Sequence, residues 1–274
     1  MNAFCPNLSN KKVKQEFDEL TSLFGEDAAY FLWNKNNGYS LDKAPNGADS
    51  ILFKSLLDNY NGDRQAALKA KAKVYTSNFT NWFGDWTKED KTDVSKVVDE
   101  NGEPLVVYHG GSNTKIFNTK GGQFGAGIKK GDIGTYFTPS KKSAEYYEAI
   151  YDYKIGEKWL TLKELADNGE LSEEDIKSLD EAWENEKPNT RAFFLNIRNP
   201  KITNYIGDNT KGFNKEDYNI DENDDGQFIN INSSKPKEYV AFNSNQIKSA
   251  TDNKGTFSDQ NDSVYESKQD TVSQ

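Results

Sequence analysis

The spacing of the apolar residues changes near residue 90, and this change limits the folds that are open to the chain. Before it, apolar side chains recur every three or four residues, as they do in amphipathic helices. Members of two such stripes are Val13, Phe17, Leu20, Phe24, Ile51, Leu52, Leu56 and Leu57. After it, short β-branched and aromatic runs alternate with loops rich in Gly, Asn and Asp, which is typical of strands joined by turns. The sequence therefore predicts an α+β protein in which a helical part precedes a β-rich part.

Residues 1–91 are predicted to form a small helical module. The Ala-rich segment 63–75 has a strong helix propensity. The bulky aromatic residues that follow this segment are Phe79, Trp82, Phe83 and Trp86. A polar break at 87–93 comes next, and we place the domain boundary there. The β-rich domain is then expected to cover residues 92–258.

The β-rich domain is predicted to contain mainly antiparallel strands. Asn101-Gly102 signals a hairpin turn between 97–98 and 105–108, although Pro104 lengthens the loop. The other segments with strand composition are 135–138, 191–197, 228–231 and 238–242.

Residues 151–190 form an acidic insert in this domain, with 12 acidic residues and 5 lysines, which gives a net charge of −7. Within the insert, 159–186 is predicted to be a helical hairpin on the surface, because its charge density does not suit a core. Two interpretations stay open: an arm that binds a basic partner, and a solvated helical pair without a function. The polar segment 259–274 lacks periodicity and is predicted to be a disordered tail.

Composition excludes several classes of function. The net charge of −10 disfavours a protein that binds nucleic acid over a broad surface, because phosphates would be repelled. With one cysteine, Cys5, and one histidine in the chain, we expect neither a disulfide nor a metal site. The sequence has neither an apolar stretch long enough to span a bilayer nor a secretory signal pattern. These features predict a cytoplasmic protein with no membrane partner.

The single histidine, His109, ends an apolar strand and precedes Gly110 and Gly111. Glycine allows a flat ligand to approach the main-chain N–H and C=O groups, so this strand end is suited to hold one. Taken alone, His109 is better explained as a half-buried, hydrogen-bonded side chain.

Two tyrosines and one glutamate complete the candidate residues. Tyr136 lies on a short strand, and Tyr146 lies on a helix that is expected to start after a capping Ser140. A slot between two phenol rings would suit a flat aromatic group such as nicotinamide, but taken alone the two tyrosines are better explained as core residues. Glu238 opens the strand at 238–242, where a solvated edge residue is usual.

Together these segments resemble the His-Tyr-Glu class of ADP-ribosyltransferases, which includes poly(ADP-ribose) polymerases and diphtheria-like toxins. The motifs that carry the resemblance, in the order of that class, are Tyr108-His109-Gly110, Gly134-Thr135-Tyr136-Phe137, Lys142-Ser143-Ala144-Glu145-Tyr146 and Glu238-Tyr239-Val240. The stretches 95–110 and 242–250 are similar to the ADP-ribosyltransferase domains of phage polyvalent proteins and MuF-type toxins. The resemblance implies a split antiparallel β-sheet fold over 92–258, preceded by the helical module.

The resemblance also implies NAD as the co-substrate and roles for particular residues. The catalytic residues would be His109, Tyr136 and Glu238. The residues that bind NAD would be His109, Gly110, Tyr136, Ser143 and Tyr146. In that arrangement His109 binds the adenosine ribose, while Gly110 and Ser143 bind the nicotinamide amide. Glu238 binds the nicotinamide ribose, where a fixed carboxylate stabilises the positive charge that develops as the glycosidic bond breaks.

The sequence departs from the arginine-specific toxins, which carry Gln/Glu-x-Glu and Ser-Thr-Ser motifs. Pro236 stands two residues before Glu238, and no Ser-Thr-Ser is present. An enzyme of the arginine-specific class is therefore not expected, and the acceptor stays open. We expect a mono-ADP-ribosyltransferase that modifies a macromolecule, most simply a protein, for example a phage-borne toxin or effector that acts on host machinery. Two alternatives stay open: an NAD glycohydrolase that uses the same site, and a virion or interaction module without catalysis.

Overall fold

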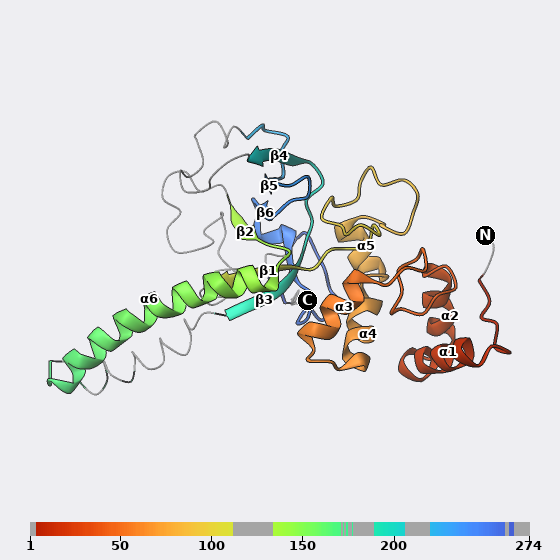
Figure 1. Cartoon of the computed structure of the whole chain (residues 1–274), viewed down its shortest axis with the longest axis horizontal. Helices are drawn as coiled ribbons and strands as arrows, with labels where there is room; N and C mark the ends of the chain where they lie inside the picture. The colour runs from red at the N-terminus through yellow and green to blue at the C-terminus, as the bar shows by residue number, and fades with distance from the viewer. Residues whose placement is uncertain are drawn as a thin grey trace, which may run out of the picture. The chain divides into compact units, whose positions relative to one another are not determined.

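A computed structural model of the chain (Figure 1) describes residues 4–111, 134–170, 172, 174, 177, 189–205, 220–260 and 263–265. The chain divides into two compact units. Unit 1 comprises Met1–Val106, Ala192–Asn199 and Asn245–Gln274, and unit 2 comprises Val107–Arg191 and Pro200–Ser244.

Unit 1 begins with the predicted helical module, which the structure confirms. Its helices are α1 (Lys11–Phe24), α2 (Glu26–Lys35), α3 (Ile51–Asn59), α4 (Arg64–Lys73) and α5 (Ser77–Phe83). Side-chain caps fix four of the helix starts, because Asn10, Ser50, Asp63 and Thr76 each accept a hydrogen bond from a main-chain N–H of the first turn.

The aromatic residues of α5 pack against residues from much later in the chain. The ring of Phe79 lies 5.3 Å from that of Phe194 and 4.9 Å from that of Phe257, between ring centroids. Trp82 stacks on Phe257 at 5.9 Å, and its Nε1 donates a hydrogen bond of 3.0 Å to the carbonyl oxygen of Asn245. The last helix of the predicted module therefore shares one hydrophobic core with segments of the predicted β-rich domain.

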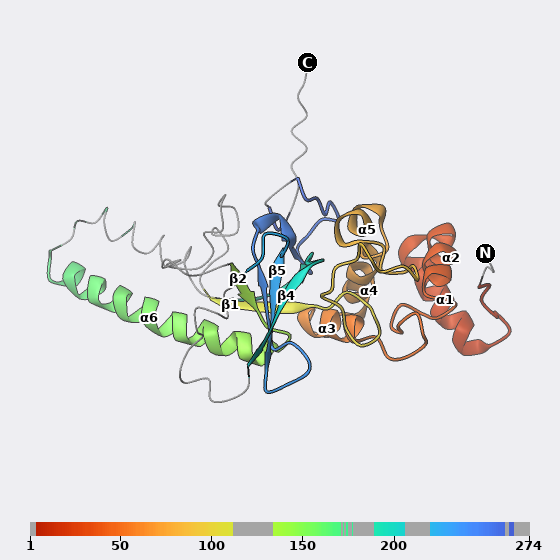
Figure 2. The ribbon, with the colours of Figure 1, turned by 90° about the horizontal axis from the view of Figure 1, so that it is seen from above.

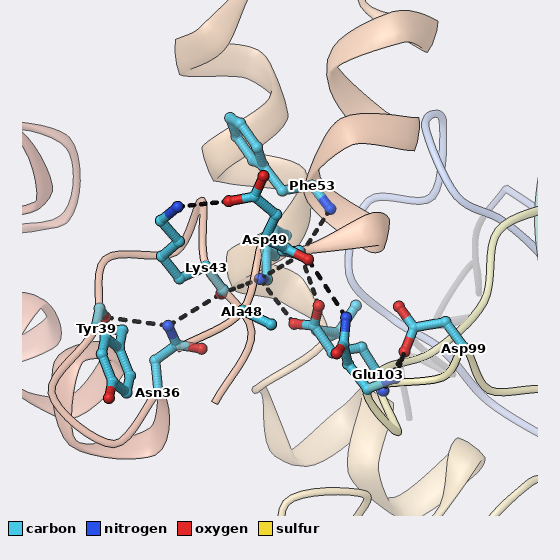
Figure 3. Close-up of polar contacts among 12 residues, drawn as sticks. Asn36, Tyr39, Lys43, Ala48, Asp49, Phe53, Asp99 and Glu103 are labelled. Atoms are coloured by element: carbon cyan, nitrogen blue, oxygen red, sulfur yellow. Dashed lines mark hydrogen bonds and ion pairs between the residues drawn. The ribbon is translucent and has the colours of Figure 1, made fainter. Parts of the chain in front are cut away.

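A buried ion pair joins α4 to the hairpin at 97–105. Figure 3 shows polar contacts around Glu103 and Asp99 of this hairpin. Lys71 Nζ lies 2.7 Å from Glu103 Oε1, and neither side chain is exposed. Ser50 Oγ accepts from Lys71 Nζ at 2.8 Å and donates to Glu103 Oε2 at 2.6 Å. Burial lowers the pKa of Lys71, and the negative charge of Glu103 opposes this effect. Removal of either partner would leave a buried charge uncompensated, so the pair ties the helices to the hairpin.

Two strands complete unit 1 in the later part of the chain. Strand β3 (Asn189–Leu195), part of which lies in unit 2, pairs antiparallel with β7 (Ile247–Ser249), with Phe194 opposite Lys248. Residues 263–265, in the segment predicted to be disordered, instead lie against β7 and the loop that follows it. Val264 is fully buried, and its carbonyl oxygen accepts from the N–H of Ser249 at 2.9 Å.

Unit 2 is built around a four-stranded sheet of order β2-β6-β5-β4. Its strands are β2 (Thr135–Phe137), β4 (Pro200–Tyr205), β5 (Gly226–Ile231) and β6 (Glu238–Ala241). The β2–β6 and β5–β6 pairs are antiparallel, whereas β4 and β5 are parallel. The second sheet has the order β1-β3-β7, with β1 spanning Val107–Gly111. The predicted α+β architecture with a split sheet is confirmed, and the parallel pairing of β4 with β5 departs from the antiparallel pairing that the sequence favours.

Helix α6 (Lys141–Asp167) is one continuous helix (Figure 2). The sequence predicted a helix from Lys141 and a separate helical hairpin that starts at 159. The first arm of that hairpin is part of α6, because no proline interrupts the segment and Gly156 is tolerated in a helix at a cost of about 1 kcal/mol. Most of the second arm lies outside the described residues. In the parts of the chain that are described, no helix is both long and apolar enough to cross a membrane.

Candidate active site

Unit 2 contains all six residues that the sequence singled out. Strand β1 carries His109 and Gly110, β2 carries Tyr136, α6 carries Ser143 and Tyr146, and β6 carries Glu238. The site therefore depends on how β1, α6 and β6 meet in this unit.

Gly110 lets β1 pack directly on the first turn of α6. A Cβ atom at position 110 would lie 1.8 Å from the carbonyl oxygen of Ala144, a separation that no side chain can occupy. Ala144 is itself buried. The glycine is thus required sterically, and it places the backbone of β1 beside the helix turn that carries Ser143.

His109 is oriented by the backbone of β2. Its Nδ1 donates a hydrogen bond of 2.8 Å to the carbonyl oxygen of Tyr136, and since a carbonyl oxygen only accepts, Nδ1 carries the proton. Burial lowers the pKa of His109, and the hydrogen bond to Tyr136 opposes that effect. The lowered pKa favours the neutral form of the ring, in which Nε2 is a hydrogen-bond acceptor.

Tyr136 and Glu238 lie on the same face of the four-stranded sheet. Tyr136 is directly opposite Val240 in the β2–β6 pair, and side chains two residues apart on a strand share a face. Such diagonal neighbours lie roughly 7–8 Å apart, within reach of long and aromatic side chains. The close approach of the two strands depends on Gly134, where a Cβ would lie 2.2 Å from the carbonyl oxygen of Ala241.

A pocket of about 650 Å³ lies between the start of α6 and the start of β6. Its lining residues are Thr138, Pro139, Ser140, Lys142, Ser143, Tyr146, Tyr147, Ile231, Lys237 and Glu238. The pocket thus brings together three of the predicted residues, Ser143, Tyr146 and Glu238. The other three meet beside it, where β1 contacts β2 and α6.

Glu238 is the carboxylate in the pocket wall. Its side chain is half-buried, and burial raises its pKa. The start of β6 is held by a hydrogen bond of 2.8 Å from the N–H of Lys237 to the carbonyl oxygen of Ile229. The carboxylate is therefore fixed on the sheet in partly desolvated surroundings, where its electrostatic effect on a bound cation is stronger than in water.

Tyr146 is 65% exposed, so the interpretation of this tyrosine as a core residue is wrong. Its ring makes an edge contact with that of Tyr147, with 5.9 Å between centroids. Burial raises the pKa of Tyr147, and the negative charge of Glu238 adds to the increase. The sequence prediction missed Tyr147, for which the only signal is its position directly after Tyr146 at the start of a helix.

No three His, Cys, Asp or Glu side chains gather as metal ligands would in the described part of the chain. A search of curated proteins and a search of solved structures gave no match. The model of the family described as ADP-ribosyltransferase in polyvalent proteins matches residues 99–257. This range covers more than half of the 274 residues and includes β1, the pocket and all six predicted residues. The chain therefore belongs to the family of ADP-ribosyltransferases in polyvalent proteins.

Proposed function

We propose that the domain is an NAD-dependent mono-ADP-ribosyltransferase, which cleaves the bond between nicotinamide and ribose and transfers ADP-ribose to a protein. The observation that carries this proposal is the pocket in which Glu238 on β6 faces Ser143 and Tyr146 on α6. Residues of the family's motifs thus line the pocket from both α6 and β6, and the pocket is large enough to hold part of a dinucleotide.

In this proposal, the start of α6 and the end of β1 hold the nicotinamide. Ser143 and the main chain of Gly110 bind its amide group, and the exposed ring of Tyr146 provides a stacking face opposite Tyr136. His109 accepts a hydrogen bond from a ribose hydroxyl through Nε2, because its hydrogen bond to Tyr136 fixes the tautomer with the proton on Nδ1.

Glu238 acts on the bond that breaks. As the bond between nicotinamide and ribose lengthens, positive charge develops on the ribose, and the carboxylate stabilises that charge more than it stabilises bound NAD. Because Glu238 is half-buried, its charge is less screened than that of a surface carboxylate. The acceptor then attacks the ribose carbon, and neutral nicotinamide leaves.

Incubation of the protein with NAD labelled in its adenylate part, together with a bacterial lysate, tests this function. The expected result is label on lysate protein that resists denaturation, with release of nicotinamide. Nicotinamide release without labelled protein would instead show an NAD glycohydrolase. Absence of both would leave a binding or virion module and would contradict the proposal.

We further propose that the acceptor is a host protein met in the cytoplasm, as an effector or toxin borne by a phage would meet it. The membership in a family of polyvalent proteins and the composition of the chain support this setting. If only proteins of the phage particle itself became labelled, and no host protein did, this proposal would be contradicted.

A further inference from the structure

Several residues that line the pocket have no role in NAD binding as proposed above. They include two lysines, Lys142 and Lys237, and one tyrosine, Tyr147. They line the same space as Glu238 and thus adjoin the ribose carbon that is attacked. This part of the pocket is where an acceptor group would enter.

The charge of this part of the pocket is positive. Lys142 and Lys237 are exposed, and neither ammonium group forms an ion pair with any of the described residues. Glu238 is the only carboxylate among the lining residues. Two cations therefore face one anion, and an occupant with a negative charge would be favoured.

The start of α6 adds to this preference. Ser140 precedes the helix, and Lys142 and Ser143 lie in the first turn of its 27 residues. A helix of this length carries a partial positive charge at its N-terminus, which stabilises anions that bind there. The hydroxyl groups of Ser140 and Ser143 are further donors at the same edge of the pocket.

We propose that the acceptor is a carboxylate of an acidic protein side chain, bound by Lys142 and Lys237, so that the product is an ADP-ribosyl ester. The proposal rests on the proposed transferase function. A carboxylate oxygen of the acceptor forms a bond to the ribose carbon as the bond from that carbon to the nicotinamide nitrogen breaks. The electron pair of the broken bond goes to nicotinamide, whose positive charge is lost, and the acceptor gives up its negative charge. No proton moves.

Other acceptors fit the pocket less well. A lysine or arginine acceptor would be repelled by the two ammonium groups, and a lysine, arginine or hydroxyl acceptor would have to lose a proton. The single carboxylate in the pocket, Glu238, is already engaged with the ribose in the proposed mechanism. A nucleic-acid phosphate shares the negative charge of a carboxylate, but the net charge of −10 of the chain opposes the approach of a polyanion.

The test uses three defined acceptor probes with the full chain and labelled NAD: poly-L-glutamate, poly-L-arginine and a single-stranded RNA. We expect label on poly-L-glutamate alone, and we expect neutral hydroxylamine to release it rapidly, as it does an ester. Label on arginine or RNA would overturn the proposal, and so would nicotinamide release without any label on poly-L-glutamate. If nicotinamide is not released at all, the transferase function itself has failed.

A double variant, Lys142→Ala with Lys237→Ala, separates the acceptor from the donor. We expect nicotinamide release without a probe to stay near the wild-type rate, while transfer to poly-L-glutamate falls by up to about tenfold, since each exposed ion pair contributes a few-fold in binding. Lys158→Ala is the matched control, because Lys158 is an exposed lysine on α6 that does not line the pocket. An equal loss of both activities in the double variant would show that the lysines bind NAD instead.

Discussion

His109 and Tyr136 are joined by a hydrogen bond of 2.8 Å, in which Nδ1 of the histidine donates to the carbonyl oxygen of the tyrosine. The bond connects β1 to β2 through the main chain of Tyr136 and orients the imidazole ring. His109 and Tyr136 belong to separate sequence motifs, but in the structure the main chain of β2 at Tyr136 orients the ring of His109.

Substitution of His109 by alanine should weaken NAD binding. The variant loses the Nε2 acceptor proposed for the ribose, and one neutral hydrogen bond is worth about 0.5–1.5 kcal/mol, which corresponds to roughly 2- to 13-fold in the dissociation constant. Calorimetric titration with NAD measures this change, with thermal unfolding as the check on folding. An unchanged dissociation constant in a folded variant would show that His109 only supports the strand.

Substitution of Gly110 by alanine should destabilise unit 2. The new Cβ would lie 1.8 Å from the carbonyl oxygen of Ala144, and since that atom belongs to buried backbone, β1 and α6 must separate. Overpacking of this kind typically costs about 1–3 kcal/mol, which differential scanning calorimetry would record as a lower melting temperature. Gly156→Ala is the control, because it lies inside α6, where alanine is favoured over glycine. Equal melting temperatures of the two variants would contradict the packing described.

The stability of unit 1 should depend on pH because of Asp99. Burial raises its pKa to about 6, and the negative charge of Glu103 adds to the increase. Because the folded-state pKa exceeds the unfolded value, the protonated form stabilises the fold at low pH, and this contribution is lost as the pH rises through about 6. Asp99→Asn avoids the buried charge and can still accept from the N–H groups of Asn101 and Glu103.

The Asp99→Asn variant should accordingly melt a few degrees above the wild type at pH 7–8. The difference should vanish near pH 4, where the wild-type side chain is protonated. Melting curves over this pH range measure both parts of the prediction. A difference that does not change with pH would mean that Asp99 is not the group that titrates.

Limited proteolysis should cut the exposed loop at 87–93. The fragments should nevertheless remain associated, because Phe79 and Trp82 pack on Phe194 and Phe257 from beyond the cut. Size-exclusion chromatography of the cut protein under native conditions checks this. Separation of the fragments would support residues 1–91 as an independent module, which stays a prediction from the sequence.

Local patterns in the sequence predicted the elements that have a clear composition or period. The helical module and strands β2, β3, β5 and β6 were predicted, because capping residues and aromatic or β-branched runs mark them. Strands β4 and β7 were missed. Strand β7 has three residues, too few for a period to show, and β4 mixes Thr203 and Asn204 with apolar residues.

Long-range contacts are the part that the sequence could not provide. Lys71 lies in a run of Ala and Lys residues whose composition is typical of a solvent-exposed helix. In the structure Lys71 is buried and paired with Glu103, which is distant in sequence. The candidate site shows the same limit. Motifs identified Ser143, Tyr146 and Glu238, whereas Ile231 and Tyr147 join the pocket only through the packing of β5 and α6 around it.

The rate of nicotinamide release by Glu238→Gln, measured beside its affinity for NAD, tests the central claim most directly. The amide keeps the shape of the side chain, and it removes a carboxylate whose pKa is raised by burial, so we expect a folded variant that binds NAD about as well as the wild type. Nicotinamide release should fall by about 10²- to 10³-fold, the usual effect of removing one group that stabilises a transition-state charge. Release within a few-fold of the wild-type rate would show that Glu238 is not the catalytic carboxylate.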